Sequence, residues 1–209
     1  MSDKSSTREC ILKAAMERIQ HYGYAKTTMS EIARDCGMSA GNIYRFFASK
    51  VDIAEAMARK FNMEIHQDQA KIARKAVSAV DRLREIIEYE METTFDKLDK
   101  DAKILEVAEV LARERPLFAT EELAQERIHL VKILKDGISE GVFASITDLD
   151  RAAEMIQTAT MKFRYPQLFT RLTIEQLREE YNGVMDLVIA GLAQGFCAMS
   201  GKPETVTAE

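Results

Sequence analysis

Apolar residues recur along this chain at intervals of three and four, which is the spacing of one face of an α-helix. Capping residues and glycines divide the pattern into nine predicted helices, over residues 6–22, 28–36, 39–47, 50–76, 78–95, 103–113, 120–140, 147–163 and 173–195. The charged run from Asp96 to Asp101 predicts a loop. No stretch alternates apolar and polar residues for long enough to predict a strand. The pattern therefore predicts an all-α fold.

Composition supports this interpretation and narrows the class of protein. The 209 residues include only 9 Gly and 3 Pro, and residues that favour helices dominate. No apolar run is long enough to cross a membrane, and the N-terminus lacks the apolar core of a signal peptide. We therefore expect a cytoplasmic protein with no membrane partner.

The stretch from Thr28 to Lys50 carries the most specific local pattern. Thr28 and Glu31 have the spacing of a capping box, in which each side chain binds the backbone N–H of the other residue. Gly37 suits the left-handed backbone that ends a helix, and Ser39 is placed to cap the next one. Two short helices joined by a glycine turn predict a helix-turn-helix, whose second helix normally lies in the DNA major groove.

The same stretch carries a longer signature, made of Thr27, Thr28, Ile32, Ala33, Gly37, Ser39, Gly41, Ile43, Tyr44, Phe47 and Lys50. This signature resembles the TetR family of one-component transcriptional regulators. The resemblance implies a three-helix DNA-binding domain over residues 1–49, followed by a larger helical domain over residues 50–209. In that family the larger domain binds a small-molecule effector and forms a homodimer. The resemblance also implies repression, in which the dimer binds a palindromic operator and the effector releases it.

Charge is distributed unevenly along the chain. The net charge is −5, but residues 1–60 carry +3 and residues 61–209 carry −8. A basic N-terminal end on an acidic body suits contact with double-stranded DNA through that end alone. The positive excess is modest, which favours binding as a dimer.

Side chains near the start of the second helix of the motif are expected to contact DNA. Asn42 suits adenine, and Arg45 suits guanine or a phosphate. Gly41 has no side chain and lets the backbone approach the groove. From the family resemblance, Tyr44 and Lys50 are expected to bind phosphates.

Other positions in the motif allow two interpretations. Thr28 and Ser39 stand at helix starts, where hydroxyl and N–H groups suit an anion, but capping alone explains both residues equally well. Ala40 stands where a polar residue that reads bases is common, and Phe46 stands where many family members have His. We keep Ala40 in the predicted contact surface and expect base readout to depend partly on DNA shape.

The last two predicted helices supply the predicted dimer interface. Small residues on the eighth helix and two glycines four residues apart on the ninth allow close approach of a partner helix. A four-helix interface with two-fold symmetry follows. The predicted interface residues are Ala152, Ile156, Ala159, Phe163, Tyr181, Val184, Val188, Gly191 and Gly195.

The middle of the predicted body is rich in methionine, aromatic residues and threonine. Such residues most often form ordinary core, and the alternative is an apolar effector pocket between helices. The predicted pocket residues are Phe61, Met63, Tyr89, Met91, Phe95, Met155, Thr158 and Met161. Gln157, His129 and Arg164 are candidates for polar groups that orient the effector, whose identity the sequence leaves open.

Nothing in the sequence predicts catalysis. There is no glycine-rich phosphate loop and no nucleophile-elbow motif. The 3 histidines are isolated from the partners that a metal site needs, and the run of Glu88, Glu90 and Glu92 suggests a solvated helix face. We expect no metal, no cofactor and no enzyme activity. The alternatives to a repressor are an activator, a helix-turn-helix protein that binds other proteins and, least favoured, a helical enzyme.

The cysteines Cys10, Cys36 and Cys197 are widely separated and form no C-x-x-C pair. Free thiols in a reducing compartment explain them. The alternative is a redox sensor that acts through Cys36, which lies beside the predicted DNA-reading helix.

Overall fold

The computed structural model describes residues 2–100, 103–164 and 172–195. Within these ranges the chain forms nine α-helices and one 3₁₀-helix and no strand, so the all-α prediction is confirmed. The helices are α1 (Ser2–Tyr22), α2 (Met29–Asp35), α3 (Ala40–Ile43), α4 (Lys50–Ile72), α5 (Ala79–Lys100), α6 (Ile104–Glu114), α7 (Phe118–Ser139), α8 (Leu149–Ala159), the 3₁₀-helix η1 (Met161–Arg164) and α9 (Ile174–Gln194). None of these helices is both long and apolar enough to cross a membrane.

Several helices begin or end a few residues away from their predicted bounds. For example, α1 already begins at Ser2, and α4 ends at Ile72. α5 continues to Lys100, so the predicted loop is wrong from Asp96 to Lys100, and Asp101 lies outside the described residues. The run contains no glycine or proline to stop the helix, and helix-forming Lys and Leu lie between its aspartates. α8 is capped by Asp148 and not by Thr147, and the Asp148 carboxylate accepts a hydrogen bond from the Arg151 N–H.

The N-terminal end of the molecule, which we call the head (residues 2–49), has its own small core. Ile11 and Ile19 of α1, Ile32 of α2 and Ile43 of α3 are at most 1 % exposed, and Ile53 of α4 packs with them. Each of these isoleucines lies on the apolar face that the helical spacing predicts. The core therefore fixes the angle between the two helices of the motif.

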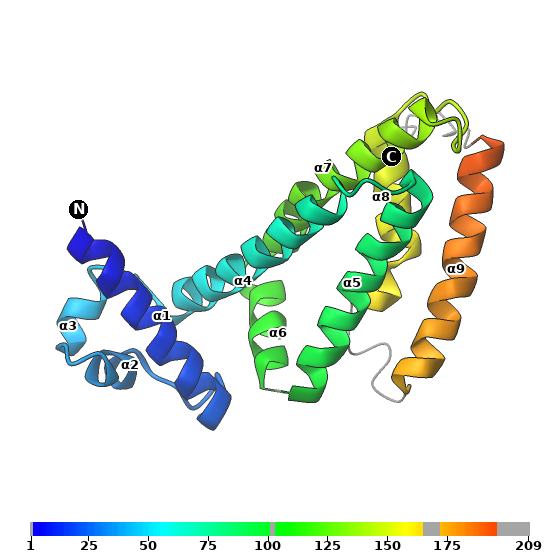
Figure 1. Cartoon of the computed structure of the whole chain (residues 1–209). Coiled ribbons are helices and arrows are strands. Elements are labelled where there is room, and N and C mark those ends of the chain that lie inside the picture. Colours follow the sequence, from blue (N-terminus) through cyan, green and yellow to red (C-terminus); the bar gives the residue numbers. More distant parts are fainter. Residues whose placement is uncertain (1, 101–102, 165–171, 196–209) are drawn as a thin grey trace, which may run out of the picture.

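The remaining helices form the body, with α5 at its centre. α5 contacts α4, α6, α7, α9 and η1. Its side chains meet those of α7 and α8 in one apolar core, whose fully buried members include Leu83, Ile86, Ile87, Met91, Leu130, Ile133, Leu134 and Ala153. In Figure 1, α9 forms the outer edge of the body, at the opposite end of the molecule from α1, α2 and α3.

α4 joins the two parts as one continuous helix (Figure 1). Ile53 and Ala54, near its start, belong to the head core, whereas Ile72, at its end, belongs to the body core. No glycine or proline interrupts it. A tilt of α4 within the body therefore carries the head with it.

Candidate DNA-binding surface and its links to the body

The second helix of the motif is short and lies on the surface of the head. α3 follows Ser39, whose backbone has the extended N-cap conformation, although its hydroxyl makes no capping hydrogen bond. Beyond Ile43, the N–H groups of Phe46 and Phe47 bind the Ile43 carbonyl and continue the helical turn. Ile43 and Phe47 are buried, so the inner side of the turn is anchored and the outer side remains free.

α2 begins with the predicted capping box, which the structure confirms. The Thr28 hydroxyl accepts a hydrogen bond from the Glu31 N–H at 3.3 Å, and the Glu31 carboxylate accepts one from the Thr28 N–H at 3.0 Å. The hydroxyl also donates to that carboxylate at 2.8 Å, and this bond is the main reason why the pKa of Glu31 is lowered. In the free protein, the Thr28 hydroxyl is therefore engaged in capping.

Arg18 of α1 joins the two helices at the edge of the head core. Its guanidinium lies 2.9 Å from the Glu31 carboxylate and 2.8 Å from that of Asp35. These ion pairs fix the position of α2 along the length of α1. Sequence reasoning did not identify them, because Arg18 carries no local signal that it reaches across to another helix.

Most of the predicted DNA-contacting residues are exposed to solvent, at the start of α2 and along α3 with the residues that flank it. The exposed members are Thr28, Ser39, Ala40, Gly41, Tyr44 and Arg45, and Asn42 is half-buried. The Tyr44 side chain is 54 % exposed. A Cβ atom built on Gly41 would meet no atom of this chain within 4 Å. A duplex can therefore reach this face without displacing any part of the protomer.

Lys50 lies at the start of α4 and has partners within the chain. Its ammonium donates to the carbonyls of Tyr24 and Thr27, at 2.7 Å in each case, and lies 4.1 Å from the centre of the Tyr24 ring. Burial lowers the pKa of Lys50. An ammonium has three donors, so one is left for an anion. Phosphate binding by Lys50 stays a prediction, and its observed role is to hold the turn between α1 and α2.

The first turn of α6 grips the same turn of the head. The Glu106 carboxylate accepts a hydrogen bond from the Tyr24 N–H at 2.8 Å. The Lys103 ammonium donates to the carbonyls of Gln20 and His21, at 3.1 and 2.5 Å, at the C-terminal end of α1. Lys103 thus meets carbonyls that the C-terminal end of α1 leaves without helical partners, and Glu106 meets an N–H of the turn that follows. We call the contacts of Glu106 and Lys103 the α6 clasp.

Gly23 lies inside the α6 clasp. Its φ is +87°, and a Cβ atom there would lie 3.1 Å from both carboxylate oxygens of Glu106. Glycine is therefore required at this position for its backbone and for the close approach of Glu106. Further along α6, Val107 and Leu111 are 7 % and 3 % exposed and belong to the head core. α6 is thus attached to the head by charge and by packing.

Ion pairs form a second link, between α4 and the segment that joins α6 to α7. Arg115 pairs with Asp52 and with Glu55, the latter at 3.0 Å. Arg59 bonds to Glu55 at 3.0 Å and to Glu122 of α7 at 3.0 Å. Apart from Arg59 and Glu55, which lie one turn apart on α4, these partners are about 60 positions apart in the chain, so no local pattern predicted them.

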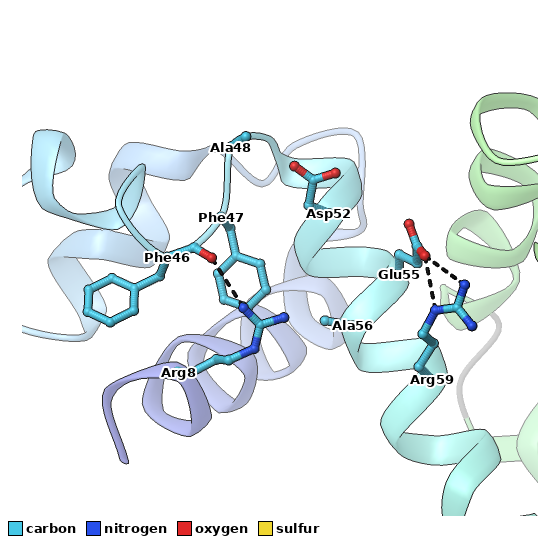
Figure 2. Close-up of a pocket in the computed structure, with 8 residues that line it drawn as sticks. All are labelled: Arg8, Phe46, Phe47, Ala48, Asp52, Glu55, Ala56 and Arg59. Carbon is cyan, nitrogen blue, oxygen red and sulfur yellow. Dashed lines mark hydrogen bonds and ion pairs between the residues drawn. The ribbon is translucent and has the colours of Figure 1, made fainter. Parts of the chain in front are cut away.

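Two surface hollows flank these ion pairs. The first has a volume of about 400 Å³ and lies between α1, the segment before α4, and α4 itself (Figure 2). At its edge Arg8 donates to the Phe46 carbonyl at 3.2 Å and lies 4.0 Å from the centre of the Phe47 ring. The second, of about 260 Å³, lies between α4 and residues 114–118. Neither hollow includes a residue of the predicted effector pocket.

Most residues predicted for the dimer interface line the core of one protomer instead. Four of them are at most 3 % exposed, namely Ala152, Ile156, Phe163 and Tyr181, and their assignment to an interface is wrong. Val184 and Val188 pack half-buried against the same core. Apolar periodicity marks a covered face but does not say whether the same chain or a second copy covers it.

The other three predicted interface residues are exposed. Gly195 ends α9 with φ +102°, so its backbone already explains the glycine. Ala159 and Gly191 remain available to a partner. Gly191 shares one side of α9 with exposed Gly183, Leu187 and Ala190, and Leu187 is 77 % exposed. We call these four residues of α9 its small-residue face.

The residues predicted for the effector pocket are dispersed. Met91 is buried in the body core, and Tyr89 and Phe95 pack against it. Phe61, Met155 and Met161 are half-buried. Met63 is 53 % exposed, and Thr158 is exposed on α8 with its hydroxyl bonded to the Glu154 carbonyl. The assignment of Met63 and Thr158 to an interior pocket is therefore wrong, because helical spacing alone did not tell which side of α4 and α8 faces inward.

Charged groups occupy the interior of the body beside these apolar residues. Arg164 of η1 lies 2.6 Å from Glu90 of α5 and pairs with both carboxylate oxygens of Glu126 of α7. Glu90 and Glu126 are only 7 % and 4 % exposed. Gln69 of α4 donates to Glu90 at 2.8 Å. Glu90 is therefore not on a solvated helix face, as its acidic neighbours in sequence had suggested.

Two carboxylates share one guanidinium in this buried triad of Glu90, Glu126 and Arg164, which leaves one excess negative charge. Burial raises the pKa of Glu90 well above its ordinary value. Burial opposes ionisation of Glu126 as well, but the Arg164 guanidinium outweighs it and the pKa of Glu126 is lowered. The protein therefore keeps an ionised and a readily protonated carboxyl side by side.

Substitution of Gly23 tests the α6 clasp. Gly23→Ala and Gly37→Ala both force a side chain into a positive φ, which costs about 1–2 kcal/mol. Only Gly23→Ala also displaces Glu106, because the space around Gly37 is open. We expect Gly23→Ala to lower the free energy of unfolding by about 1 kcal/mol more than Gly37→Ala, since Glu106 must shift and its hydrogen bond to the Tyr24 N–H weakens. Equal losses in urea unfolding would contradict a tight clasp.

Substitutions in the buried triad have opposite expected effects. Arg164→Met leaves two buried carboxylates without a counter-charge and should lower the free energy of unfolding by about 3–5 kcal/mol at neutral pH. Glu90→Gln keeps the shape and removes the excess charge, so it should be nearly neutral or stabilising.

The pH dependence of the triad follows from the raised pKa of Glu90. In the wild type, the contribution of Glu90 to the free energy of unfolding is fully present below the unfolded-state pKa of a glutamate, about 4.3. It is lost as the pH rises through the raised pKa that Glu90 has in the folded state. The stability of Glu90→Gln relative to wild type should therefore increase from pH 4 upward, until Glu90 is ionised, in urea unfolding at a series of pH values. A constant difference would mean that Glu90 does not titrate in this range.

Known proteins resemble this chain along most of its length. A family profile described as "Bacterial regulatory proteins, tetR family" matches residues 11–57, and a "Tetracyclin repressor-like, C-terminal domain" profile matches residues 79–185. The transcriptional repressor KstR2 of Rhodococcus jostii is 24 % identical over 198 residues, which cover 92 % of this chain and 94 % of that protein. The fatty acid metabolism regulator protein of Bacillus subtilis is 26 % identical over 196 residues, covering 87 % and 93 %.

Solved structures show the same fold. Thermus thermophilus FadR in complex with lauroyl-CoA superposes with a TM-score of 0.68 at 20 % identity, over 93 % of this chain and 100 % of that one. Bacillus subtilis FadR in complex with stearoyl-CoA gives 0.66 at 23 % identity, over 88 % and 98 %. The two profiles match both the helix-turn-helix and the body, and the second alone spans half of the sequence. The chain therefore belongs to the TetR family of transcriptional regulators.

Proposed function

We propose that this protein is a ligand-responsive repressor that binds a palindromic operator as a homodimer in the cytoplasm. Residues 1–49 act as the DNA-binding domain, and residues 50–209 bind the effector and the second subunit. The observation that carries the proposal is the outer face of α3, where Tyr44 and Arg45 are exposed and the space beside Gly41 is open.

Roles on this face follow from the chemistry of each residue. Asn42 and Arg45 offer paired hydrogen-bonding groups to base edges, and Tyr44 offers a hydroxyl to a phosphate. Thr28, Ser39 and Ala40 border the duplex at the starts of α2 and α3. The free backbone N–H groups at the start of a helix can bind a phosphate.

Arg45→Ala and Gly41→Ala test the DNA-binding role. Arg45→Ala removes a bidentate contact with a base. It should therefore weaken operator binding by about 1–3 kcal/mol and relax base preference at one position. Gly41→Ala should leave the free protein as stable as before or slightly more stable, because the new methyl meets open space, yet lower operator affinity by crowding the groove floor.

Lys13→Ala is the matched control for Arg45→Ala. It removes the same charge from a side chain that is 80 % exposed on α1, where its partner is Glu17. Fluorescence anisotropy with operator DNA at several salt concentrations measures each variant. If Lys13→Ala and Arg45→Ala lose the same affinity, the effect is general electrostatics and α3 does not read the operator.

The small-residue face of α9 is the proposed centre of the homodimer interface. Its glycines and alanine allow close approach, and Leu187 is an exposed apolar side chain that a second copy would cover. Leu187→Asp should yield monomers in light scattering and lose operator affinity, because two heads must bind together. Asn182→Asp adds the same charge to another side of α9 and should remain dimeric. Dimeric Leu187→Asp protein would place the interface elsewhere.

For the effector, we propose an acyl-CoA thioester. The support is that two FadR structures of the same fold hold lauroyl-CoA and stearoyl-CoA, and that their matches extend over 88–93 % of this chain. The body interior combines apolar Met91, Tyr89 and Phe95 with the polar groups of Gln69 and Arg164, which suits a ligand with an apolar chain and a polar end.

Release of operator DNA tests the effector. Lauroyl-CoA should dissociate the complex in fluorescence anisotropy, whereas free CoA and free laurate, each at the same concentration, should act weakly because each lacks half of the ligand. Effector and operator then weaken each other's binding by the same factor. If lauroyl-CoA neither releases DNA nor raises the melting temperature, the effector is of another class.

A further inference from the structure

Arg8 of α1 is held against the segment that follows α3. Its guanidinium donates a hydrogen bond to the Phe46 carbonyl at 3.2 Å and lies 4.0 Å from the centre of the Phe47 ring. Figure 2 shows the side chain reaching from α1 toward both phenylalanines. Phe46 directly follows Arg45, which is exposed beyond the end of α3. A cation of α1 is therefore fixed beside the proposed DNA-binding surface.

Ion pairing distinguishes two of the four arginines of the head from the other two. Arg18 lies within 2.9 Å of two carboxylates, and Arg34 lies 3.9 Å from the Asp35 carboxylate. Arg8 and Arg45 form no ion pair with a carboxylate of the described residues. The charges of these two arginines therefore remain available to an anion from outside the protein.

Arg8 also lies where the motif itself supplies no charge. From Phe46 to Ser49 no side chain is charged, and the ammonium of Lys50 already donates to two carbonyls. Arg8 is exposed and supplies a cation to this interval from another helix. In Figure 1, the start of α1 and α3 both lie at the outer end of the head, away from the body.

We propose that Arg8 binds a phosphate of the DNA backbone, beside the groove that α3 enters. The ligand is a phosphodiester of double-stranded DNA, and the inference rests on the proposed function. Arg45 contacts the duplex from within the motif, and Arg8 contacts it from α1.

The guanidinium of Arg8 has the donors that this contact needs. A guanidinium carries five N–H donors, and the Phe46 carbonyl accepts from only one of its nitrogens. The other N–H groups can form the paired hydrogen bonds that arginine makes with two phosphate oxygens. The Phe46 carbonyl and the Phe47 ring hold the side chain in place before DNA binds, so less conformational entropy is lost on binding.

A phosphate contact has a different signature from a base contact. It positions the protein on the duplex but reads no sequence, so its loss weakens binding to every sequence alike. Each neutralised phosphate contributes about 0.9 to the slope of log affinity against log salt concentration, so a dimer that loses two Arg8 contacts should lose about 2. Arg45→Ala should change base preference as well.

Arg8→Gln in the full-length chain tests the contact. Glutamine can keep a hydrogen bond to the Phe46 carbonyl but removes the charge. In fluorescence anisotropy at several salt concentrations, we expect several-fold weaker binding and the smaller salt slope, with operator and with a duplex of unrelated sequence. Arg8→Lys should keep the wild-type slope at intermediate affinity, because lysine keeps the charge but lacks the paired donors.

Lys13→Gln is the matched control. It removes the same charge from a side chain of α1 that is 80 % exposed and whose partner is Glu17. We expect this variant to keep the wild-type salt slope, because Lys13 lies outside the proposed contact. Equal losses of affinity and slope in Arg8→Gln and Lys13→Gln would mean that only the overall charge of α1 matters, and would overturn the proposal.

Neutral methylphosphonate linkages, placed one at a time along the operator, locate the phosphate. The wild-type protein should lose affinity at one position in each half-site where Arg8→Gln loses none, because the variant has already lost that contact. At every other position the two proteins should lose affinity equally. The same profile for both proteins, or an unchanged salt slope in Arg8→Gln, would overturn the proposal and leave Arg8 with a structural role only.

Failure of the proposed function gives a different result. Wild-type protein that binds operator no more tightly than unrelated DNA would refute the operator-binding repressor. The salt slopes of wild type and Arg8→Gln on either duplex would still decide whether Arg8 binds a phosphate. Wild-type protein that binds neither duplex would overturn both proposals.

Discussion

The grip of α6 on the turn between α1 and α2 is the interaction on which the rest of this structure depends. Lys103 binds carbonyls that the C-terminal end of α1 leaves without helical partners, Glu106 binds the Tyr24 N–H in the turn that follows, and Gly23 makes room for Glu106. Val107 and Leu111 then extend α6 into the head core. A shift of α6 within the body therefore reaches the DNA-binding surface through two kinds of contact, and does not depend on the tilt of α4 alone.

The head is held as a rigid unit, which makes such a shift effective. Its isoleucines interlock α1, α2, α3 and the start of α4, and Arg18 adds ion pairs across α1 and α2. Lys50 ties the start of α4 to the same turn that α6 grips. These contacts converge on one turn, so the body and α4 hold the head at the same place.

The body interior has a different character, because charge is buried in it. Three charged residues meet in the interior of the body, where apolar residues would need no partner charge. They are Glu90 of α5, Glu126 of α7 and Arg164 of η1. Buried ion pairs seldom stabilise a fold more than apolar residues of the same size. Removal of one charge from its partner would leave an uncompensated buried charge, so these ion pairs strongly favour one arrangement of α5, α7 and η1.

The sequence by itself determined the all-α class, the helix-turn-helix and the capping box of α2, because each depends on spacings within a few residues. It did not determine which apolar faces belong to the core of one protomer. Ile156 and Tyr181 therefore seemed to be interface residues, and exposed Met63 seemed to line a pocket. Only the tertiary structure brought Glu106 to Tyr24 and Arg164 to Glu90. The residues of these two pairs lie 82 and 74 positions apart, and at that distance the fold alone decides which side chains meet.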